Sequence, residues 1–489
     1  MKNRILLSAI AVLAMAAPLA SGPAQAVDGD QPPFKLTMPP EVTATSYDGQ
    51  VYLETGPRLT TGSEPFELRA TRASYSEPIV VRWMRSGGAV TLPSGAMTDF
   101  HGLPNFFRTA IRGPKGHLFS ASWTPLCPSG ETGRARPDAP AHNPYPSGCP
   151  YHPFTLGSVI GMQSGWYTEF GDGFYGADGS PLKPGTYKMV TTIHEKYREM
   201  FEVSLADARK ETVLKVVQGS ADGFRQREAA ADPTPAPLPQ PARSRPTGRA
   251  GTPVAGPRPD LRSLPAFGMQ VGSKGNYLQF EATVWNGGTS PMVVDGFRRE
   301  GQDLMDAHQY FFDTDGNQTG YQNVGTMEWD PRPSHQHWHF TDFARYRLLN
   351  ADKTLARRSQ KEAFCLANTD AVDYTLPAAD WHPEGTDLGT ACGDYGSQSV
   401  RESLAAGSGD TYGQYRAGQS FDLRGLPNGV YFISVEANPE HKLIETSTTN
   451  NDSLRRVRIG GRSGHRTVTY GPVGIVDDSG AGGYSFRTH

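Results

Sequence analysis

Hydrophobic and polar side chains alternate along many short stretches of the chain. A period of two places every second side chain on the same face of a β-strand, so these stretches predict strands with one buried face. Two of them have their apolar positions at Leu278, Phe280, Ala282 and Val284, and at Tyr431, Ile433, Val435 and Ala437. Because such runs occur on both sides of the chain's middle, we expect a mainly β fold.

One segment lacks this pattern and divides the chain. From Pro233 to Pro259, nine of 27 residues are proline, and no aromatic residue occurs between Phe224 and Phe267. Such a composition is typical of an extended spacer. We therefore predict two β-sandwich-like domains joined by a Pro-rich linker. The expected ranges are 27–225 for the first domain, 226–257 for the linker and 258–489 for the second domain.

The N-terminus resembles an export signal. Lys2 and Arg4 precede an apolar run over Ile5–Leu19, and Ala24–Ala26 has the small-x-small pattern of a signal-peptidase site. We expect cleavage before Val27 and a secreted, extracellular protein. Later stretches fall short of the ~18 apolar residues of a membrane span, so we expect no membrane span in the mature chain. A retained N-terminal anchor is the alternative.

Composition argues against several other classes. The formal net charge is -3, from 47 basic and 50 acidic side chains, which indicates neither a nucleic-acid partner nor a disordered chain. The 55 glycines and 40 prolines would break helices often, so coiled coils and helical bundles are excluded.

The four cysteines are Cys127, Cys149, Cys365 and Cys392. In an exported chain an even number of cysteines predicts disulfides, and four cysteines allow three connectivities. We favour the pairing of close neighbours, Cys127 with Cys149 and Cys365 with Cys392. Each bond would stabilise its domain by ~3 kcal/mol.

The two predicted domains share landmarks in the same order. Offsets of 238 and 244 relate His101, Lys115, Cys127, Ser164-Gly165 and Tyr187 to His339, Lys353, Cys365, Ser408-Gly409 and Tyr431. The run 77–81 also resembles 290–294. We interpret this as an internal duplication, with chance similarity of two β-sandwiches as the alternative.

A histidine cluster is the sharpest chemical signal. His335, His337 and His339 alternate in a stretch whose aromatic neighbours favour a strand. On a strand the three imidazoles project from one face and converge on one point, where a metal could bind. Imidazole suits zinc, copper, nickel or iron. Three protein ligands leave a coordination position open for chemistry, whereas an adventitious surface cluster is the alternative.

Other short motifs follow the histidines along the chain. They are Phe343-Ala344-Arg345-Tyr346, Phe364-Cys365-Leu366, Asp410-Thr411-Tyr412-Gly413, Gly429-Val430-Tyr431, Asn438-Pro439, Glu445 and Thr449-Asn450-Asn451. In this order they resemble the lysyl oxidase family, which are copper amine oxidases with a peptide-derived quinone. The resemblance covers nearly all of residues 258–475.

The resemblance implies a role for each matching residue. His335, His337 and His339 would bind copper, and Lys361 and Tyr412 would be joined as lysyl tyrosylquinone. The cofactor would convert a primary amine, such as peptidyl lysine, to an aldehyde, with dioxygen as oxidant and hydrogen peroxide and ammonia as products. Without the resemblance, Lys361 would be interpreted as solvated and Tyr412 as a core residue.

Two assignments carry named alternatives, and a third concerns the first domain. Asp410 is our candidate for the base that removes the substrate's α-proton, with capping of a turn as the alternative. Asp260 and Asn451 match the places that supply calcium ligands in some family members, with loop capping as the alternative. In the repeat, Met97, Asp99 and His101 stand at the histidine positions, so we predict that the first domain is non-catalytic.

Two other functions compete with an amine oxidase. A secreted copper-binding or surface-adhesion protein would keep the histidines and lack turnover, and it would have no need of Lys361 and Tyr412. A zinc hydrolase would use the histidines and a bound water, and it would also leave these two residues without a role.

Overall fold

The computed structural model describes most of the chain. The described residues are 32–47, 50–53, 55–170, 173–174, 182–219, 243–247, 250–253, 255–332, 335–361, 363–416 and 418–479. The expected signal peptide and most of the expected linker lie outside them. We call the described residues from 32 to 219 the N-terminal half and those from 250 to 479 the C-terminal half. No helix among the described residues is long and apolar enough to cross a membrane.

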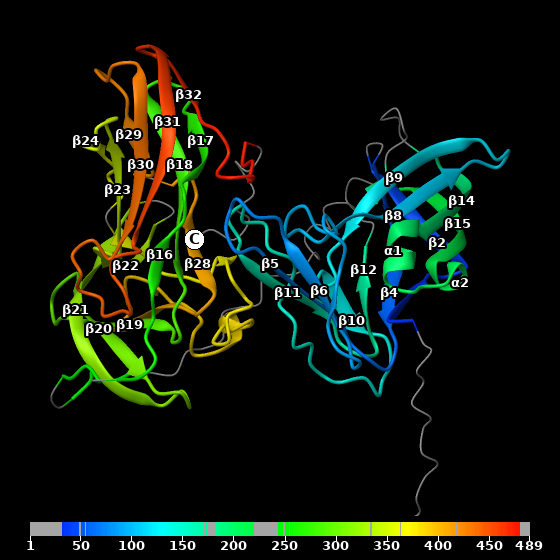
Figure 1. Cartoon of the computed structure of the whole chain (residues 1–489), viewed down its shortest axis with the longest axis horizontal. Helices are drawn as coiled ribbons and strands as arrows, with labels where there is room; N and C mark the ends of the chain where they lie inside the picture. Colours follow the sequence, from blue (N-terminus) through cyan, green and yellow to red (C-terminus); the bar gives the residue numbers. More distant parts are fainter. Residues whose placement is uncertain are drawn as a thin grey trace, which may run out of the picture.

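The N-terminal half contains three sheets and two short helices, on the right of Figure 1. Sheet β1-β4-β12-β10 consists of Phe34–Thr37, Arg58–Thr61, Trp166–Glu169 and Glu131–Arg134. Sheet β11-β5-β6-β7 consists of Gly157–Met162, Phe66–Thr71, Val80–Met84 and Val90–Thr91. Sheet β13-β3-β2-β15-β14-β8-β9 consists of Gly173–Phe174, Gln50–Leu53, Glu41–Tyr47, Arg209–Gln218, Gly185–Ile193, Leu103–Arg112 and Leu118–Leu126. The helices are α1 (Glu195–Met200) and α2 (Leu205–Ala208).

The C-terminal half also contains three sheets. Sheet β16-β18-β28-β26 consists of Leu261–Ser263, Tyr277–Asn286, Ser408–Tyr412 and Asp370–Ala371, with β17 (Phe267–Val271) and β29 (Ser420–Asp422) also paired to β18. Sheet β25-β22-β21-β20-β19-β27 consists of Ala363–Phe364, His337–Thr341, Gln318–Asp330, Leu304–Phe312, Met292–Arg298 and Ser399–Leu404. Sheet β24-β23-β30-β31-β32 consists of Leu355–Arg358, Ala344–Leu349, Gly429–Ala437, Asp452–Arg462 and His465–Thr469. A short 3-10 helix spans Pro383–Gly385. The mainly β prediction is confirmed.

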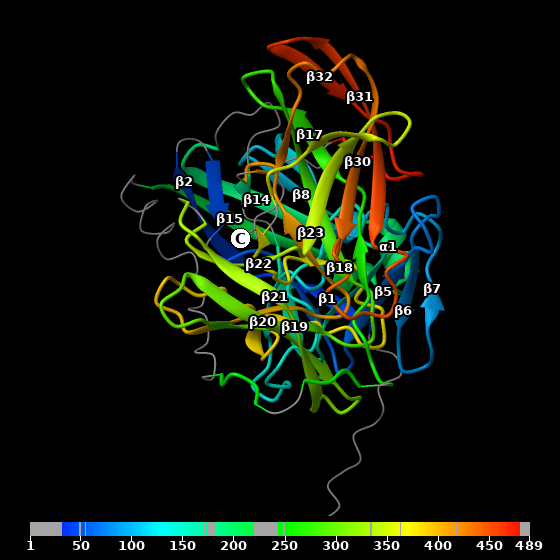
Figure 2. The same ribbon diagram turned by 90° about the vertical axis from the view of Figure 1, so that its left-hand side faces the viewer.

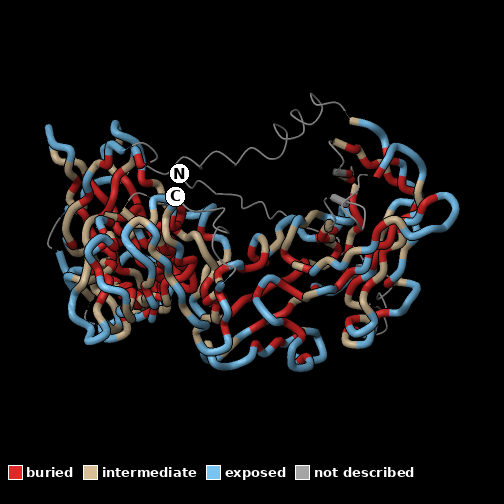
Figure 3. The backbone as a smooth tube through the Cα atoms, turned by 90° about the horizontal axis from the view of Figure 1, so that it is seen from above, coloured by how far each residue is buried: buried red, intermediate tan, exposed pale blue. Residues whose placement is uncertain are grey.

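The three sheets of the C-terminal half enclose one core. In Figure 2, β19, β20 and β21 cross the lower part of this half, and β18, β30 and β31 run through its upper part. The apolar faces predicted for β18 and β30 are buried within this core. Figure 3 shows buried segments inside both halves, with exposed segments around them. Both disulfides join the close neighbours, as predicted, and link Cys127 to Cys149 and Cys365 to Cys392.

The two halves share strand order. β1-β4-β12 corresponds to β16-β18-β28, β11-β5-β6-β7 to β27-β19-β20-β21, and β2-β15-β14-β8-β9 to β32-β31-β30-β23-β24. The bounds of β14 and β30 differ by 244 at both ends. One pair departs from the correspondence, because β2 is parallel to β15 whereas β32 is antiparallel to β31. In the shared strand order β5 corresponds to β19, and β6 corresponds to β20. The similar runs 77–81 and 290–294 lie at the starts of β6 and β19, so they do not lie on corresponding strands.

The described residues 243–247 and 250–253 of the expected linker follow the surface of the C-terminal half. Arg245 forms an ion pair with Asp306 at 2.6 Å, and Gly251 forms a β-bridge with Tyr321. This part of the linker is therefore bound to one half, and is not a free spacer between the two.

Candidate metal and cofactor site

Strand β22 carries two of the three predicted metal ligands. His337 and His339 flank the buried Trp338, so their side chains project from the opposite face of the strand. His335 lies in the loop before the strand, and its ring centroid is 6.0 Å from that of His337 and 5.5 Å from that of His339. The predicted strand is therefore correct only from His337 onward, yet the three imidazoles do converge.

Asp330 joins this cluster and was not predicted from the sequence. It is the last residue of β21, which pairs with β22. Its Oδ2 atom lies 3.3 Å from Nδ1 of His335 and 3.4 Å from Nδ1 of His339. Two ligand atoms on one tetrahedral ion with bonds of about 2.0–2.1 Å have a similar separation. The signal in the sequence was a carboxylate five residues before the first histidine.

The donor set fits a bound metal ion. His335 is 2% exposed, and neither of its ring nitrogens has a hydrogen-bond partner within the described residues. A buried polar atom without a partner is costly unless something else satisfies it. The ligand atoms that lie within 4.8 Å of one another are those of Asp330, His335 and His339, whereas His337 faces the other ring nitrogen of His339, with 2.9 Å between their Nε2 atoms. Imidazole and carboxylate donors together suit copper, zinc or iron.

Burial and hydrogen bonding favour the protonation states of these side chains that bind a metal. Burial, with a smaller effect of Lys361, lowers the pKa of His335 to about 4 and that of His339 to about 2. Burial raises the pKa of Asp330, but hydrogen bonds from the side chain and backbone of Arg332 outweigh it and hold that pKa well below its usual range. At neutral pH His335 and His339 are thus neutral and Asp330 is ionised, which are the forms that bind metals.

Lys361 and Tyr412 lie next to each other beside this cluster. Nζ of Lys361 is 4.6 Å from the centroid of the Tyr412 ring. Lys361 is 2% exposed and Nζ has no hydrogen-bond partner within the described residues. Burial, assisted by the positive charge of Arg332, lowers the Lys361 pKa to about 8. A lysine that is readily neutral therefore faces the tyrosine ring.

The backbone of Cys365 fixes the orientation of Tyr412. The Tyr412 hydroxyl donates to the Cys365 carbonyl at 2.8 Å and accepts from the Cys365 amide at 2.7 Å. Phe364 packs edge-on against the same ring, with centroids 4.9 Å apart. The disulfide of Cys365 with Cys392 anchors this segment in turn. Tyr412 is therefore held by both its hydroxyl and its ring.

Two buried carboxylates complete the surroundings of Tyr412. Asp410 lies on the same strand, and neither carboxylate oxygen has a hydrogen-bond partner within the described residues. Burial raises its pKa well above the usual range, against smaller opposing effects of Lys361 and the Ala367 amide. Glu402, which was not predicted, accepts from the Leu366 amide at 3.0 Å, and burial raises its pKa too. No pattern in the sequence had singled out Glu402.

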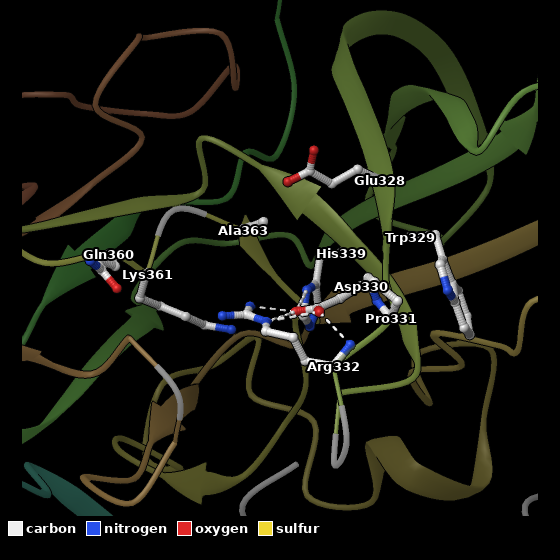
Figure 4. A pocket seen from close by; sticks show the side chains of 9 residues that line it. All are labelled: Glu328, Trp329, Asp330, Pro331, Arg332, His339, Gln360, Lys361 and Ala363. Atoms are coloured by element: carbon white, nitrogen blue, oxygen red, sulfur yellow. Dashed lines mark hydrogen bonds and ion pairs between the residues drawn. The ribbon is translucent and has the colours of Figure 1, made fainter.

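A pocket of about 310 Å³ gives access to the site. Figure 4 shows Lys361 and Arg332 pointing toward His339 and Asp330, with Trp329 and Glu328 on β21 at its side. Further lining comes from Pro331, Gln360 and Ala363. The pocket is therefore lined by Lys361 together with His339 and Asp330 of the histidine cluster.

Comparison with known proteins relates the part of the chain that forms this site to a known family. The lysyl oxidase family model matches residues 302–468, which include the histidine cluster, Lys361 and Tyr412. Residues 302–468 are therefore a lysyl oxidase domain, which lies within the C-terminal half.

Curated lysyl oxidase homologs are also similar to this chain. Lysyl oxidase homolog 2 of Bos taurus is 26% identical over 211 residues, which cover 43% of this chain and 24% of that protein. Lysyl oxidase homolog 2 of Gallus gallus is 25% identical over 203 residues, covering 41% and 23%. Lysyl oxidase homolog 3B of Danio rerio is 28% identical over 129 residues, covering 26% and 14%. The chain thus spans a quarter or less of the length of these relatives.

One solved structure aligns weakly. Dimeric latent PorU from Porphyromonas gingivalis has a TM-score of 0.12 and 9% identity, over 86% of this chain and 34% of that chain. At this score the alignment carries no information about the lysyl oxidase domain.

A second group of oxygen atoms lies at the start of the C-terminal half. The Asp260 carboxylate accepts from the side-chain amide of Asn450 at 3.1 Å. The Glu445 carboxylate accepts from the side-chain amide of Asn451 at 2.9 Å and from the backbone amide of Leu261 at 2.8 Å. Three side-chain oxygens of this group are buried and have no hydrogen-bond partner in the described structure. They are the Oδ1 atoms of Asp260, Asn450 and Asn451. The predicted pair, Asp260 and Asn451, is thus brought together through Asn450 and Glu445.

The N-terminal half has other residues at the corresponding positions. Met97 is part of an apolar core, and Trp123 is 45% exposed on β9. Asp99 and His101 lie 3.7 Å apart at the surface. Thr168 takes the place of Tyr412 on β12 and is buried. The candidate metal cluster of histidine and acidic side chains in the described residues lies wholly in the lysyl oxidase domain.

Proposed function

We propose that the protein is a secreted, copper-dependent amine oxidase that converts primary amines, such as peptidyl lysine, to aldehydes. The observation that carries this proposal is the contact of a buried, unpaired lysine with a buried tyrosine ring, 4.6 Å from Nζ to centroid, beside a histidine cluster. A metal-binding or adhesion protein has no use for that contact. Membership of the lysyl oxidase family supports the same conclusion.

Copper would be held by His335, His337 and His339, with Asp330 adjacent. Bound copper would supply the activation of dioxygen that oxidises the Tyr412 ring. The chain prepares the ligands, since the neutral imidazoles and the ionised Asp330 need to lose no proton. Arg332 keeps Asp330 ionised and closes one side of the pocket.

Lys361 and Tyr412 would become the joined cofactor, lysyl tyrosylquinone. Lys361 has to present a neutral amine to the ring, and burial provides this by disfavouring the ammonium. Cys365 holds the Tyr412 hydroxyl with two hydrogen bonds and thereby limits rotation of the ring during cross-linking. The resulting quinone would accept two electrons from the amine before dioxygen is reduced to hydrogen peroxide.

Asp410 would accept the proton from the substrate carbon next to the amine. It lies two residues before Tyr412, and its buried carboxylate has no competing hydrogen-bond partner in the described structure. A carboxylate with a raised pKa is a stronger base toward a carbon acid at neutral pH. Replacement by Asn should abolish turnover while the quinone is retained, and unchanged turnover would remove Asp410 from this role.

Calcium would occupy the oxygen group around Asp260. Three buried oxygens without partners, on Asp260, Asn450 and Asn451, are the kind of donors that calcium prefers. Arg262 competes for Asp260 at 2.7 Å, so binding would depend on the carboxylate oxygen that Arg262 leaves free.

The N-terminal half would be a duplicated copy of the lysyl oxidase domain that lacks catalysis. The shared order of strands in three pairs of sheets supports a common origin. Met97, Asp99 and Thr168 at the site positions lack the donors and the ring that the chemistry requires. We therefore assign turnover to the C-terminal half alone.

The test is oxygen-dependent release of hydrogen peroxide from primary amines by the copper-loaded full chain. We expect activity in the wild type and losses of more than a thousandfold, about 4 kcal/mol or more, in Lys361→Arg and Tyr412→Phe. The matched controls Lys442→Arg and Tyr277→Phe change partly exposed residues and should retain activity. Copper uptake without peroxide from any amine, in the wild type, would favour a copper-binding protein.

A further inference from the structure

A segment of the N-terminal half lies directly on the sheet that carries the cofactor residues. Phe154 packs in one apolar cluster with Phe267, Trp285, Val372 and other residues of the C-terminal half. The contact is ordered by backbone hydrogen bonds, because the Leu156 amide donates to the Val372 carbonyl at 2.7 Å and the Tyr374 amide donates to the Gly157 carbonyl at 3.0 Å. The Thr155 hydroxyl also donates to the Ala371 carbonyl at 3.0 Å. In Figure 1, β5 and β11 lie on the side of the N-terminal half that faces β28.

His152 extends this contact toward the cofactor strand. It is 5% exposed, and Nε2 lies 2.8 Å from the Thr283 hydroxyl on β18. Nδ1 accepts from the Phe154 amide at 3.1 Å, so the proton is on Nε2 and His152 donates to Thr283. Burial lowers the His152 pKa to about 4, which keeps the ring in this neutral form.

Thr283 connects His152 to β28 through a second hydrogen bond. Its hydroxyl lies 2.7 Å from that of Thr411, the residue directly opposite it across the β18–β28 pair. Thr411 stands between Asp410 and Tyr412, and its side chain points to the other face of the strand. The hydrogen-bonded chain His152–Thr283–Thr411 therefore ends on the back of the residues proposed to do the chemistry.

The strand on the other side of β28 is held as well. β26 pairs with β28 through Asp370 and Ala371, and the N-terminal half bonds to the carbonyls of Ala371 and Val372. A Cβ at Gly157 would lie 2.1 Å from Oδ1 of Asp373, an atom fixed by hydrogen bonds from Thr375. A larger residue at position 157 would therefore have to displace the Asp373 carboxylate from its place in the contact between the halves.

We propose that the N-terminal half braces the strand that carries Asp410 and Tyr412, with His152 as the positioning residue of that brace. The half is then a fixed part of the catalytic unit, and its task is to keep β28 in place while Lys361 and Tyr412 join. The consequence for the cofactor rests on the proposed function, whereas the effect on β28 itself does not.

The experiment measures hydrogen exchange of the Ser408–Tyr412 amides in the full chain without copper. We expect His152→Ala and Gly157→Ala each to accelerate this exchange roughly tenfold, the equivalent of about 1.4 kcal/mol. His152→Gln, which can restore a donor toward Thr283, should return exchange toward wild type. His117→Ala, in the turn between β8 and β9, and Gly87→Ala, where an added Cβ meets no atom within 4 Å, are the controls.

Two further measurements separate positioning from general destabilisation. Exchange in β21 should stay at the wild-type rate, and copper-loaded His152→Ala should bind copper normally yet give a lower yield of the Lys361–Tyr412 cross-link. Unchanged β28 exchange in both interface variants, or equal acceleration in β21, would overturn the brace. If His152→Ala does not fold, Thr283→Val removes the same hydrogen bonds from the other side. A wild type that forms no cross-link would refute the proposed function, and the exchange data would still decide on the brace.

Discussion

At the scale of single residues, the site combines side chains that are each unfavourable alone. Lys361, Asp410 and His335 are buried, and within the described residues Nζ, both carboxylate oxygens and both ring nitrogens lack hydrogen-bond partners. Burying such groups destabilises a folded protein, and they are found mainly where a function requires them. In the proposed chemistry Lys361 would supply a readily deprotonated amine, Asp410 a proton acceptor and His335 a metal ligand.

The Lys361 pKa leads to a pH dependence of cofactor formation. Burial lowers it from 10.5 to about 8, so the neutral amine becomes the major form above that pH. The rate of quinone formation after copper is added to apo-protein should therefore rise with pH and reach half of its plateau near pH 8. Quinone absorbance at pH 6 to 9.5 measures this rate. A rate independent of pH across this interval would contradict a lysine that has to lose its proton.

Asp330 should contribute to metal binding. Its Oδ2 atom is 3.3 and 3.4 Å from the Nδ1 atoms of two histidines, so it can share or orient their ion. Asp330→Asn should weaken copper binding on the order of 10–100-fold and alter the copper EPR spectrum. Asp342→Asn, which changes an aspartate in an exposed ion pair, is the matched control. Equal affinity and an equal spectrum for Asp330→Asn and wild type would exclude Asp330 from the metal site.

At the scale of elements, short strands and the loops between them position the chemistry. β22 presents His337 and His339, the loop before it brings His335 back toward β21, and β28 presents Asp410 and Tyr412. Alternation along a strand accounts for the shared face of His337 and His339, whereas His335 reaches them from the loop before β22. It could not predict Asp330, because alternation does not show how β21 folds back onto β22. It could not predict Glu402, because β27 pairs with β19, which is distant in sequence.

Calcium should stabilise the start of the C-terminal half. The oxygen group links β16 to the segment just before β31, so an ion there would join two elements. At a calcium concentration of 100 times Kd the free energy of unfolding should rise by about 2.7 kcal/mol. Thermal unfolding with calcium and with chelator measures this effect, and Asp260→Asn should remove it. Identical melting temperatures for wild type in both conditions would argue that the group only caps loops.

At the scale of the whole molecule, the N-terminal half looked from the sequence like a separate, inactive domain. The shared offsets predicted a related fold, and the matching strand orders are consistent with that. The close contact of His152 with Thr283 could not be predicted, because nothing in either local pattern indicates which faces of the two halves meet. Packing between halves is set by shape and buried area over many residues, and that information is not local in sequence.

The measurement that tests the central claim most directly is peptide mass mapping of the copper-loaded full chain after treatment with phenylhydrazine, which traps a quinone carbonyl and leaves ordinary tyrosine unmodified. The account predicts one cross-linked species that contains the Lys361 and Tyr412 peptides and carries the hydrazine. Recovery of both peptides separate and unmodified, at full copper occupancy and above pH 8, would contradict it.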